Sequence, residues 1–134
     1  MSKTAVKSGR APSAIGPYSQ AVKAGEFVFC SGQIPIDPAT GEFVSGGIEA
    51  QTAQVMKNLG EVLAAAGTGW ADVVKTTIYL TNLADFAVVN RLYGEVVGSV
   101  PPARTTVQVA ALPKGAAIEI DAVAHLPTSR GAST

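Results

Sequence analysis

Two short stretches near the end of the sequence carry the side chains best suited to chemistry. Arg104 and Thr106 alternate with β-branched and apolar residues in one stretch, and Glu119 and Asp121 do so in the second. Such alternation is typical of β-strands with one buried face. A guanidinium and a carboxylate on neighbouring strands would then meet on a rigid platform.

We predict that these stretches, 104–111 and 117–126, pair as an antiparallel hairpin through the loop at 112–115. The register that we expect puts Thr106 opposite Glu119 and Arg104 opposite Asp121, so that all four side chains share one face. A slip of one residue would separate them. Such a cluster is either a site for chemistry or an ordinary cross-strand ion pair, worth under ~1 kcal/mol if exposed. The pattern alone leaves both interpretations open.

The remaining elements mix strands with two helices. Phe27–Ser31 and Val73–Leu80 are rich in β-branched and aromatic residues and predict strands. Apolar residues at helical spacing predict a helix from Ile48 to Ala66, and a second one that Asn82 caps and that ends by Gly98. We therefore expect an α+β fold, a single two-layer domain over residues 1–126 with a mixed sheet packed against both helices. Residues 127–134 are expected to form a disordered tail.

Composition narrows the class of protein. Only 15% of the 134 residues are charged, against ~25% in typical soluble domains, which favours a homo-oligomer that buries part of its surface. The formal net charge of zero argues against nucleic-acid binding. A single cysteine, Cys30, and a single histidine, His125, offer no disulfide framework and no zinc site. No apolar run is long enough to span a membrane, so we expect a cytoplasmic protein. We also expect that it uses neither a metal nor a cofactor.

Five segments, in order from Ala11 to Ala124, resemble those of one known family. They are APSAIGPYSQA from residue 11, SGQIPIDPATGE from 31, QVMKNL from 54, DVVKTTIYLTNLADF from 72 and PPARTTVQVAALPKGAAIEIDAVA from 101. Together they are similar to the RidA/YjgF family of reactive-intermediate deaminases. The resemblance covers nearly the whole chain, and the five segments in register make it specific.

The resemblance implies a homotrimer with a barrel-like centre of sheets and helices outside, a chorismate-mutase-like arrangement. Ligands would bind in clefts between subunits. It also implies an enzyme of metabolite damage control, which hydrolyses 2-aminoacrylate, 2-iminobutanoate and related imines to 2-keto acids and ammonia. This hydrolysis requires no cofactor.

The resemblance assigns roles residue by residue. It implies that Arg104 clamps the substrate carboxylate and that Glu119 positions the attacking water. The best-known members carry cysteine at the place of Thr106, so only the backbone carbonyl is carried over there. Four further residues are implied to line the pocket: Tyr18, Ser31, Gly32 and Asn90.

Structural interpretations stand beside these roles. Tyr18 could pack at an interface, Ser31 could end a strand, Gly32 could serve backbone geometry, and Asn90 could hold a loop. Asp121 could be a structural or solvated acid, His125 a surface residue and Cys30 an inert thiol in the core.

Two other functions compete with the deaminase. A non-catalytic sensor or chaperone-like binder of small carboxylates would use Arg104 but would not need Glu119, so the presence of both residues favours the enzyme. A ribonuclease or translation inhibitor is disfavoured by the neutral charge and by a single histidine that lies outside the motifs.

Overall fold

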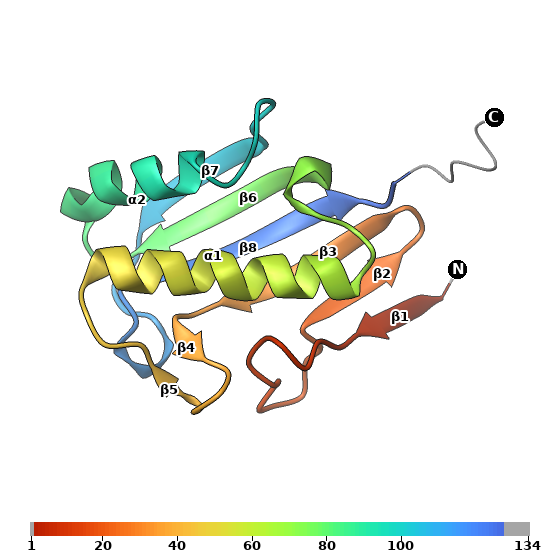
Figure 1. The fold of residues 1–134 in the computed structure, drawn as a ribbon, viewed down its shortest axis with the longest axis horizontal. Helices are drawn as coiled ribbons and strands as arrows, with labels where there is room; N and C mark the ends of the chain where they lie inside the picture. Colours follow the sequence, from red (N-terminus) through yellow and green to blue (C-terminus); the bar gives the residue numbers. More distant parts are fainter. Residues whose placement is uncertain (1, 128–134) are drawn as a thin grey trace.

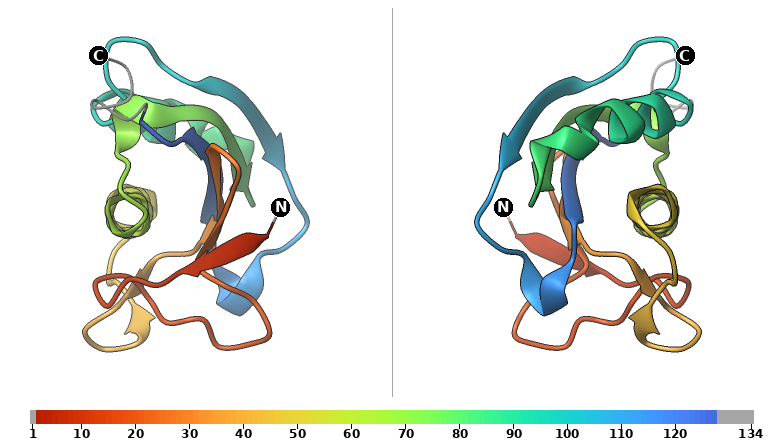
Figure 2. Two further views of the ribbon diagram at one scale, coloured as in Figure 1. Left: turned by 90° about the vertical axis from the view of Figure 1, so that its right-hand side faces the viewer. Right: turned by 90° about the vertical axis from the view of Figure 1, so that its left-hand side faces the viewer.

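A six-stranded mixed sheet carries both helices on one face in the computed structural model, which describes residues 2–127. Figure 2 shows α1 end-on to one side of the curved sheet. The order across the sheet is β1 (Lys3–Val6), β2 (Ala21–Ala24), β3 (Phe27–Gln33), β8 (Ile118–His125), β6 (Val73–Leu80) and β7 (Ala103–Gln108). Only β6 and β7 run parallel. The predicted α+β two-layer fold is confirmed.

Short elements complete the chain. A turn after Asp37 joins a small hairpin of β4 (Ile36–Asp37) and β5 (Glu42–Phe43). Three 3₁₀ turns, η1 (Trp70–Asp72), η2 (Leu83–Asp85) and η3 (Pro113–Gly115), lie in the connections. Strand β2 was not expected from the sequence.

The first helix, α1 (Ile48–Ala65), agrees with the prediction. Its apolar stripe includes Val55, Leu59 and Val62, each fully buried against the sheet. Asn82 does act as a cap, because its side chain accepts a hydrogen bond from the Ala84 amide at 2.9 Å. It caps η2, however, and α2 (Phe86–Gly94) begins only afterwards.

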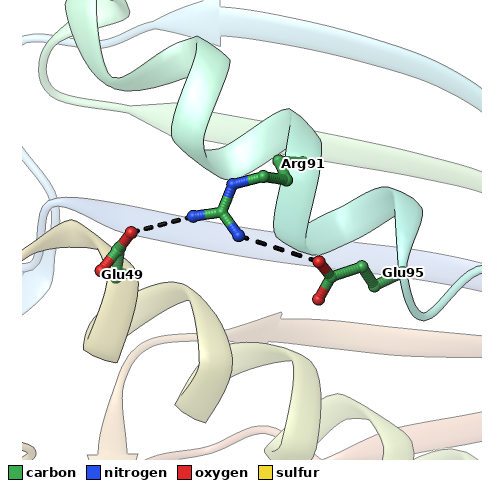
Figure 3. Close-up of polar contacts among 3 residues, drawn as sticks. All are labelled: Glu49, Arg91 and Glu95. Carbon is green, nitrogen blue, oxygen red and sulfur yellow. Dashed lines mark hydrogen bonds and ion pairs between the residues drawn. The ribbon is translucent and has the colours of Figure 1, made fainter.

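Arg91 of α2 links the two helices on the outer surface (Figure 3). Its guanidinium lies 2.9 Å from the Glu49 carboxylate of α1 and 3.7 Å from that of Glu95. All three side chains are more than half exposed, so the contacts orient the helices and add little stability.

The predicted hairpin of the last two strands is wrong. β7 pairs in parallel with β6, and β8 lies on the other side of β6, between β6 and β3. Burial explains the choice. One face of β8 is buried along its whole length, which suits a central strand, whereas β7 is almost entirely exposed and takes the edge. The order β6–α2–β7 is a strand–helix–strand crossover, which returns the chain parallel to its first strand.

The new pairing also changes which side chains share a face. Arg104 pairs with Thr76, which is buried on the helix side, so Arg104 lies on the helix side of the sheet. Glu119 pairs with Tyr79 on the opposite side. The expected sharing of one face by Arg104, Thr106, Glu119 and Asp121 is therefore wrong.

The outer parts of the chain bear on two other expectations. Most of the tail expected at 127–134 lies outside the described residues, since only Pro127 of it is described. Among residues 2–127, no helix is long and apolar enough to cross a membrane.

Candidate active site

A cavity of about 630 Å³ opens beside the end of β3, and four of the residues singled out in the sequence line it. These four residues are Tyr18, Ser31, Gly32 and Glu119. We call this cavity the glutamate pocket. The four residues come from three parts of the chain, namely the loop before β2, the end of β3 and the start of β8. The pocket is thus a product of the tertiary fold rather than of one motif.

Gly32 decides where the Glu119 side chain lies. The pairing of β3 with β8 shifts register between Cys30 and Gln33, so a bulge falls at Ser31 and Gly32. The carboxylate of Glu119 occupies the space that a β-carbon at Gly32 would need, with its Cδ at 2.7 Å and its Cγ at 2.9 Å from that point. The close approach of backbone and carboxylate explains why glycine stands here.

Ser31 ties the tyrosine loop to the strand. Its hydroxyl donates to the Ser19 carbonyl at 2.6 Å, and its amide donates to the Gln20 carbonyl at 3.0 Å. These bonds hold the segment next to Tyr18, whose side chain is 52% exposed at the rim.

Gln20 is a wall residue that the sequence analysis missed. Its buried amide donates to the Pro12 carbonyl at 2.7 Å and to the Ser8 carbonyl at 3.2 Å, and its oxygen accepts from the Ser8 amide. One side chain thereby satisfies the backbone of the irregular loop at 8–12. A glutamine just before a short strand, within a segment broken by proline and glycine, was the available signal.

The surroundings of Glu119 in the pocket disfavour its charged form. Partial burial raises the pKa of the Glu119 carboxyl, and the nearby Asp121 carboxylate raises it further. No ion pair within residues 2–127 includes either acid. A carboxyl with a raised pKa exchanges a proton closer to neutral pH, as general acid–base chemistry requires.

Arg104 stands in a second group of residues, the arginine cluster, with Phe86, Asn90 and Tyr93 of α2. Its Nη1 donates to Asn90 Oδ1 at 2.7 Å. The guanidinium carbon lies 5.3 Å from the Phe86 ring centroid and 5.2 Å from that of Tyr93. Tyr93 is itself fixed by a 2.7 Å hydrogen bond between its hydroxyl and that of Thr76.

The cluster holds the arginine and leaves most of its donors free. A guanidinium has five N–H donors, and a single side-chain acceptor binds it within the described chain. Phe86, Asn90 and Tyr93 follow one another at spacings of four and three, which puts them on one helix face. Apolar spacing predicts the helix that carries Phe86 and Tyr93, but it does not indicate their contact with Arg104.

Thr106 lies two residues beyond Arg104 on the edge strand. Its Oγ1 is buried and makes no hydrogen bond within residues 2–127. The Val109 amide donates to the Leu80 carbonyl at 2.8 Å, so alternate residues of β7 turn their backbone groups towards β6. Thr106 is out of phase with Val109 and turns its carbonyl to the free edge.

The two groups do not meet within one chain. Arg104, Asn90 and Thr106 are absent from the lining of the glutamate pocket, and the side chains of Arg104 and Glu119 leave opposite faces of the sheet. The residues that the sequence suggested for one site therefore fall into two separate groups in the single chain.

The other polar candidates lie apart from both halves. Cys30 is buried, and burial together with the Asp121 carboxylate raises its thiol pKa to about 12. His125 Nε2 lies 3.2 Å from the Glu26 carboxylate and does not line the glutamate pocket. Within residues 2–127, no group of three or more His, Cys, Asp or Glu side chains could hold a metal ion.

Comparison with known proteins gives concordant matches along the chain. The family model described as Endoribonuclease L-PSP matches residues 8–126. Protein DfrA of Myxococcus xanthus is 56% identical over 126 residues, covering 92% of this chain and 96% of the relative. The human 2-iminobutanoate/2-iminopropanoate deaminase is 50% identical over 119 residues, covering 89% of this chain and 87% of the relative.

A solved structure extends the agreement to the fold. The crystal structure of E. coli TdcF with bound serine superposes with a TM-score of 0.84 at 40% identity, covering 91% of this chain and 98% of that one.

Proposed function

The chain belongs to the RidA/YjgF family, and on that premise we propose that it hydrolyses small 2-imino acids and their enamine tautomers to 2-keto acids and ammonia. The human relative that is 50% identical is named for 2-iminobutanoate and 2-iminopropanoate. The observation that carries the proposal is the arginine cluster, in which Arg104 is held in place with its remaining donors unused.

Arg104 is the carboxylate clamp in this proposal. The Asn90 amide oxygen and the two aromatic rings fix the plane of the guanidinium, which lowers the entropy lost when a substrate binds. A planar fork can hold a carboxylate through two parallel hydrogen bonds, and serine, the molecule named with E. coli TdcF, has such a carboxylate.

Glu119 takes the proton. We assign Tyr18, Ser31 and Gly32 to substrate binding around it, and the Thr106 carbonyl to holding the water from the other half of the site. The raised pKa of Glu119 suits a group that must both accept and return a proton.

The complete site forms between two copies of the chain. Arg104 and Glu119 lie on opposite faces of one sheet, so the Arg104 half of one subunit must meet the Glu119 half of its neighbour. A cyclic homotrimer repeats this contact three times and closes. The helix-free face supports such an assembly, because it leaves Phe27 at 39% and Phe29 at 48% exposed in the single chain.

The reaction follows from this geometry. Water adds to the imine carbon while Glu119 accepts one of its protons, and the π electrons of the C=N bond pass to nitrogen. Glu119 then returns that proton to nitrogen, which gives a carbinolamine with one hydroxyl and one amino group. The hydroxyl proton next passes through Glu119 to the amino nitrogen, the electrons of the O–H bond form the C=O bond as the C–N bond breaks, and ammonia and a 2-keto acid remain. General acid–base catalysis of this kind raises the rate roughly 10²–10⁴-fold. That enhancement suits a substrate that already hydrolyses unaided in water.

One assay tests the proposal. A threonine dehydratase supplies 2-iminobutanoate, semicarbazide traps the free imine, and 2-ketobutyrate is followed in time. We expect the protein to speed ketoacid formation and to lower the semicarbazide-trapped fraction. An unchanged rate would refute the enzyme and leave the carboxylate sensor, which should still bind a small carboxylate through Arg104.

Ribonuclease activity is the second candidate, because the matching family model carries the description Endoribonuclease L-PSP. The positions of the acids and bases argue against it. The single histidine, His125, is paired with Glu26 and lies outside the glutamate pocket. RNA cleavage that survives Glu119→Gln and Arg104→Ala would favour this candidate over the deaminase.

A further inference from the structure

Tyr79 lies between two acids on the helix-free face of the sheet. It is the direct cross-strand partner of Glu119, and its hydroxyl donates to Asp121 Oδ2 at 3.0 Å. Glu119 and Asp121 are two residues apart on β8, so both point to this face with Cα atoms roughly 7 Å from each other. Tyr79 therefore lies directly opposite Glu119 on the neighbouring strand and donates a hydrogen bond to Asp121.

Few other charges face this pair within the described chain. From β6, Lys75 approaches, with its Nζ 3.4 Å from the hydroxyl of Thr77, the partner of Asp121. From η3 and the loop before β2, Lys114 and Tyr18 line the pocket into which Glu119 points. On β3, Gly32 lies against Glu119 and brings no charge. Asp121 is the only other carboxylate in this group.

We propose that Tyr79 and Asp121 are positioning residues for Glu119: the Tyr79 hydroxyl holds Asp121 as the ionised member of the pair, so that Glu119 is the acid that takes up the reaction's proton. A hydrogen bond donated to a carboxylate stabilises its charged form. Two close carboxyls resist ionising together, so the acid without this bond keeps a proton more readily.

The direction of the pKa shift of Glu119 and of Tyr79 agrees with this arrangement. The pKa of Glu119 is raised by burial and then by Asp121. The pKa of Tyr79 is raised by burial and then by its hydrogen bond to Asp121, so the phenol keeps the proton that it donates. For catalysis the inference rests on the proposed function, but the placement of the proton can be measured without any substrate.

The test is a titration of Glu119 itself. The intact oligomeric protein is labelled with glutamate ¹³C at Cδ, and the Glu119 signal is identified by its loss in Glu119→Gln. We expect Tyr79→Phe to move the Glu119 midpoint to lower pH, because Asp121 then competes for the proton. Asp121→Asn should also lower it, because the repelling charge is gone.

A double variant separates this role from a general structural effect. Once Asp121 is replaced by asparagine, adding Tyr79→Phe should leave the Glu119 midpoint where Asp121→Asn put it. Thr105→Val, which removes a hydroxyl from the same face of β7, is the control and should not move the midpoint. Unchanged midpoints in both single variants, or a further fall in the double variant, would overturn the inference.

Activity gives an independent measurement. In the imine assay, the acidic limb of the pH profile of kcat/KM should shift to lower pH in Tyr79→Phe, in step with the midpoint. If the wild type proves inactive while the midpoints still shift, the proposed function fails and the proton placement stands. If the wild type is active and the midpoints do not move, the inference fails alone.

Discussion

The carboxylate of Glu119 lies directly over the backbone of Gly32, where no β-carbon fits. A bulge in β3 brings these two residues together, although they lie 87 positions apart in the sequence. The contact fixes the acid in the lining of the glutamate pocket. It also makes the position of Glu119 sensitive to one methyl group.

Replacement of Gly32 by alanine should therefore displace Glu119 without unfolding the protein. The clashing atoms belong to a flexible side chain, which can rotate away. A shift of about 1 Å in a catalytic group can lower the reaction rate about 10²-fold. We expect kcat/KM to fall by a factor of that order. The melting temperature should change little.

Two comparisons make this prediction specific. Gly9→Ala, at a glycine with nothing within 4 Å of the added carbon, should keep full activity. In the Glu119→Gln background, Gly32→Ala should cost nothing further, since the two changes act on one group. Additive losses would contradict this coupling.

Mixed assemblies test whether the site is shared between chains. Arg104→Ala and Glu119→Gln should each lose nearly all of the activity alone, although a small residual rate of Glu119→Gln can still be measured. After the two are refolded together in equal amounts, about a quarter of the clefts should combine an intact Arg104 with an intact Glu119, and about a quarter of the wild-type activity should return. A mixture of Arg104→Ala with the double variant supplies no Arg104 and should stay inactive. Failure of the first mixture to recover would place the site within one chain.

The raised pKa of Glu119 predicts a pH-dependent stability. A folded-state pKa above the unfolded value means that the folded protein binds the extra proton, so the free energy of unfolding falls as pH rises through that range. Glu119→Gln should therefore be more stable than the wild type at pH 7, and the gain should vanish below about pH 4. Urea unfolding of the wild type and of Glu119→Gln, at equal protomer concentration and at both pH values, measures this difference in the free energy of unfolding. Glu42→Gln, at an exposed carboxylate, is the control, and an equal gain there would reject this explanation.

The hydroxyl of Thr106 offers a stability prediction of a different kind. Its Oγ1 is buried without a partner in the described chain, and a buried unsatisfied hydroxyl costs about 1–3 kcal/mol. Thr106→Val keeps the shape and the β-propensity and should raise the free energy of unfolding by about 1 kcal/mol. Thr105→Val, at an exposed neighbour, should have no comparable effect. A loss of stability in Thr106→Val would indicate that a neighbouring subunit satisfies the hydroxyl.

Much of the fold could be predicted because its elements depend on local patterns. The spacing of Val55, Leu59 and Val62 identifies α1, and the β-branched run at 73–80 identifies β6. The pairing of β7 could not be read from alternation, since alternation gives a strand two faces and does not name its neighbour. The crossover through α2 was the signal that was available for it.

The site was predicted in parts for the same reason. The motifs point to Arg104 and Glu119 as candidate site residues, but their placement on opposite faces depends on the sheet order. Tyr79 resembled an ordinary strand residue, because its importance lies in a hydrogen bond to Asp121 that is 42 residues away in sequence. Contacts of this range follow from tertiary structure and leave no periodic trace.

The central place of β8 has a consequence for how the protein is made. Strand β8 lies between β3 and β6, where His125 pairs with Phe27 and Ile118 with Leu80. It is synthesised last, so β3 and β6 leave the ribosome well before the strand that joins them. Until then each has an open edge, and β3 also exposes two phenylalanines on the helix-free face. Nascent chains should therefore depend on chaperones until late in synthesis, and folding should be slow for a domain of this size because its contacts join distant parts of the sequence.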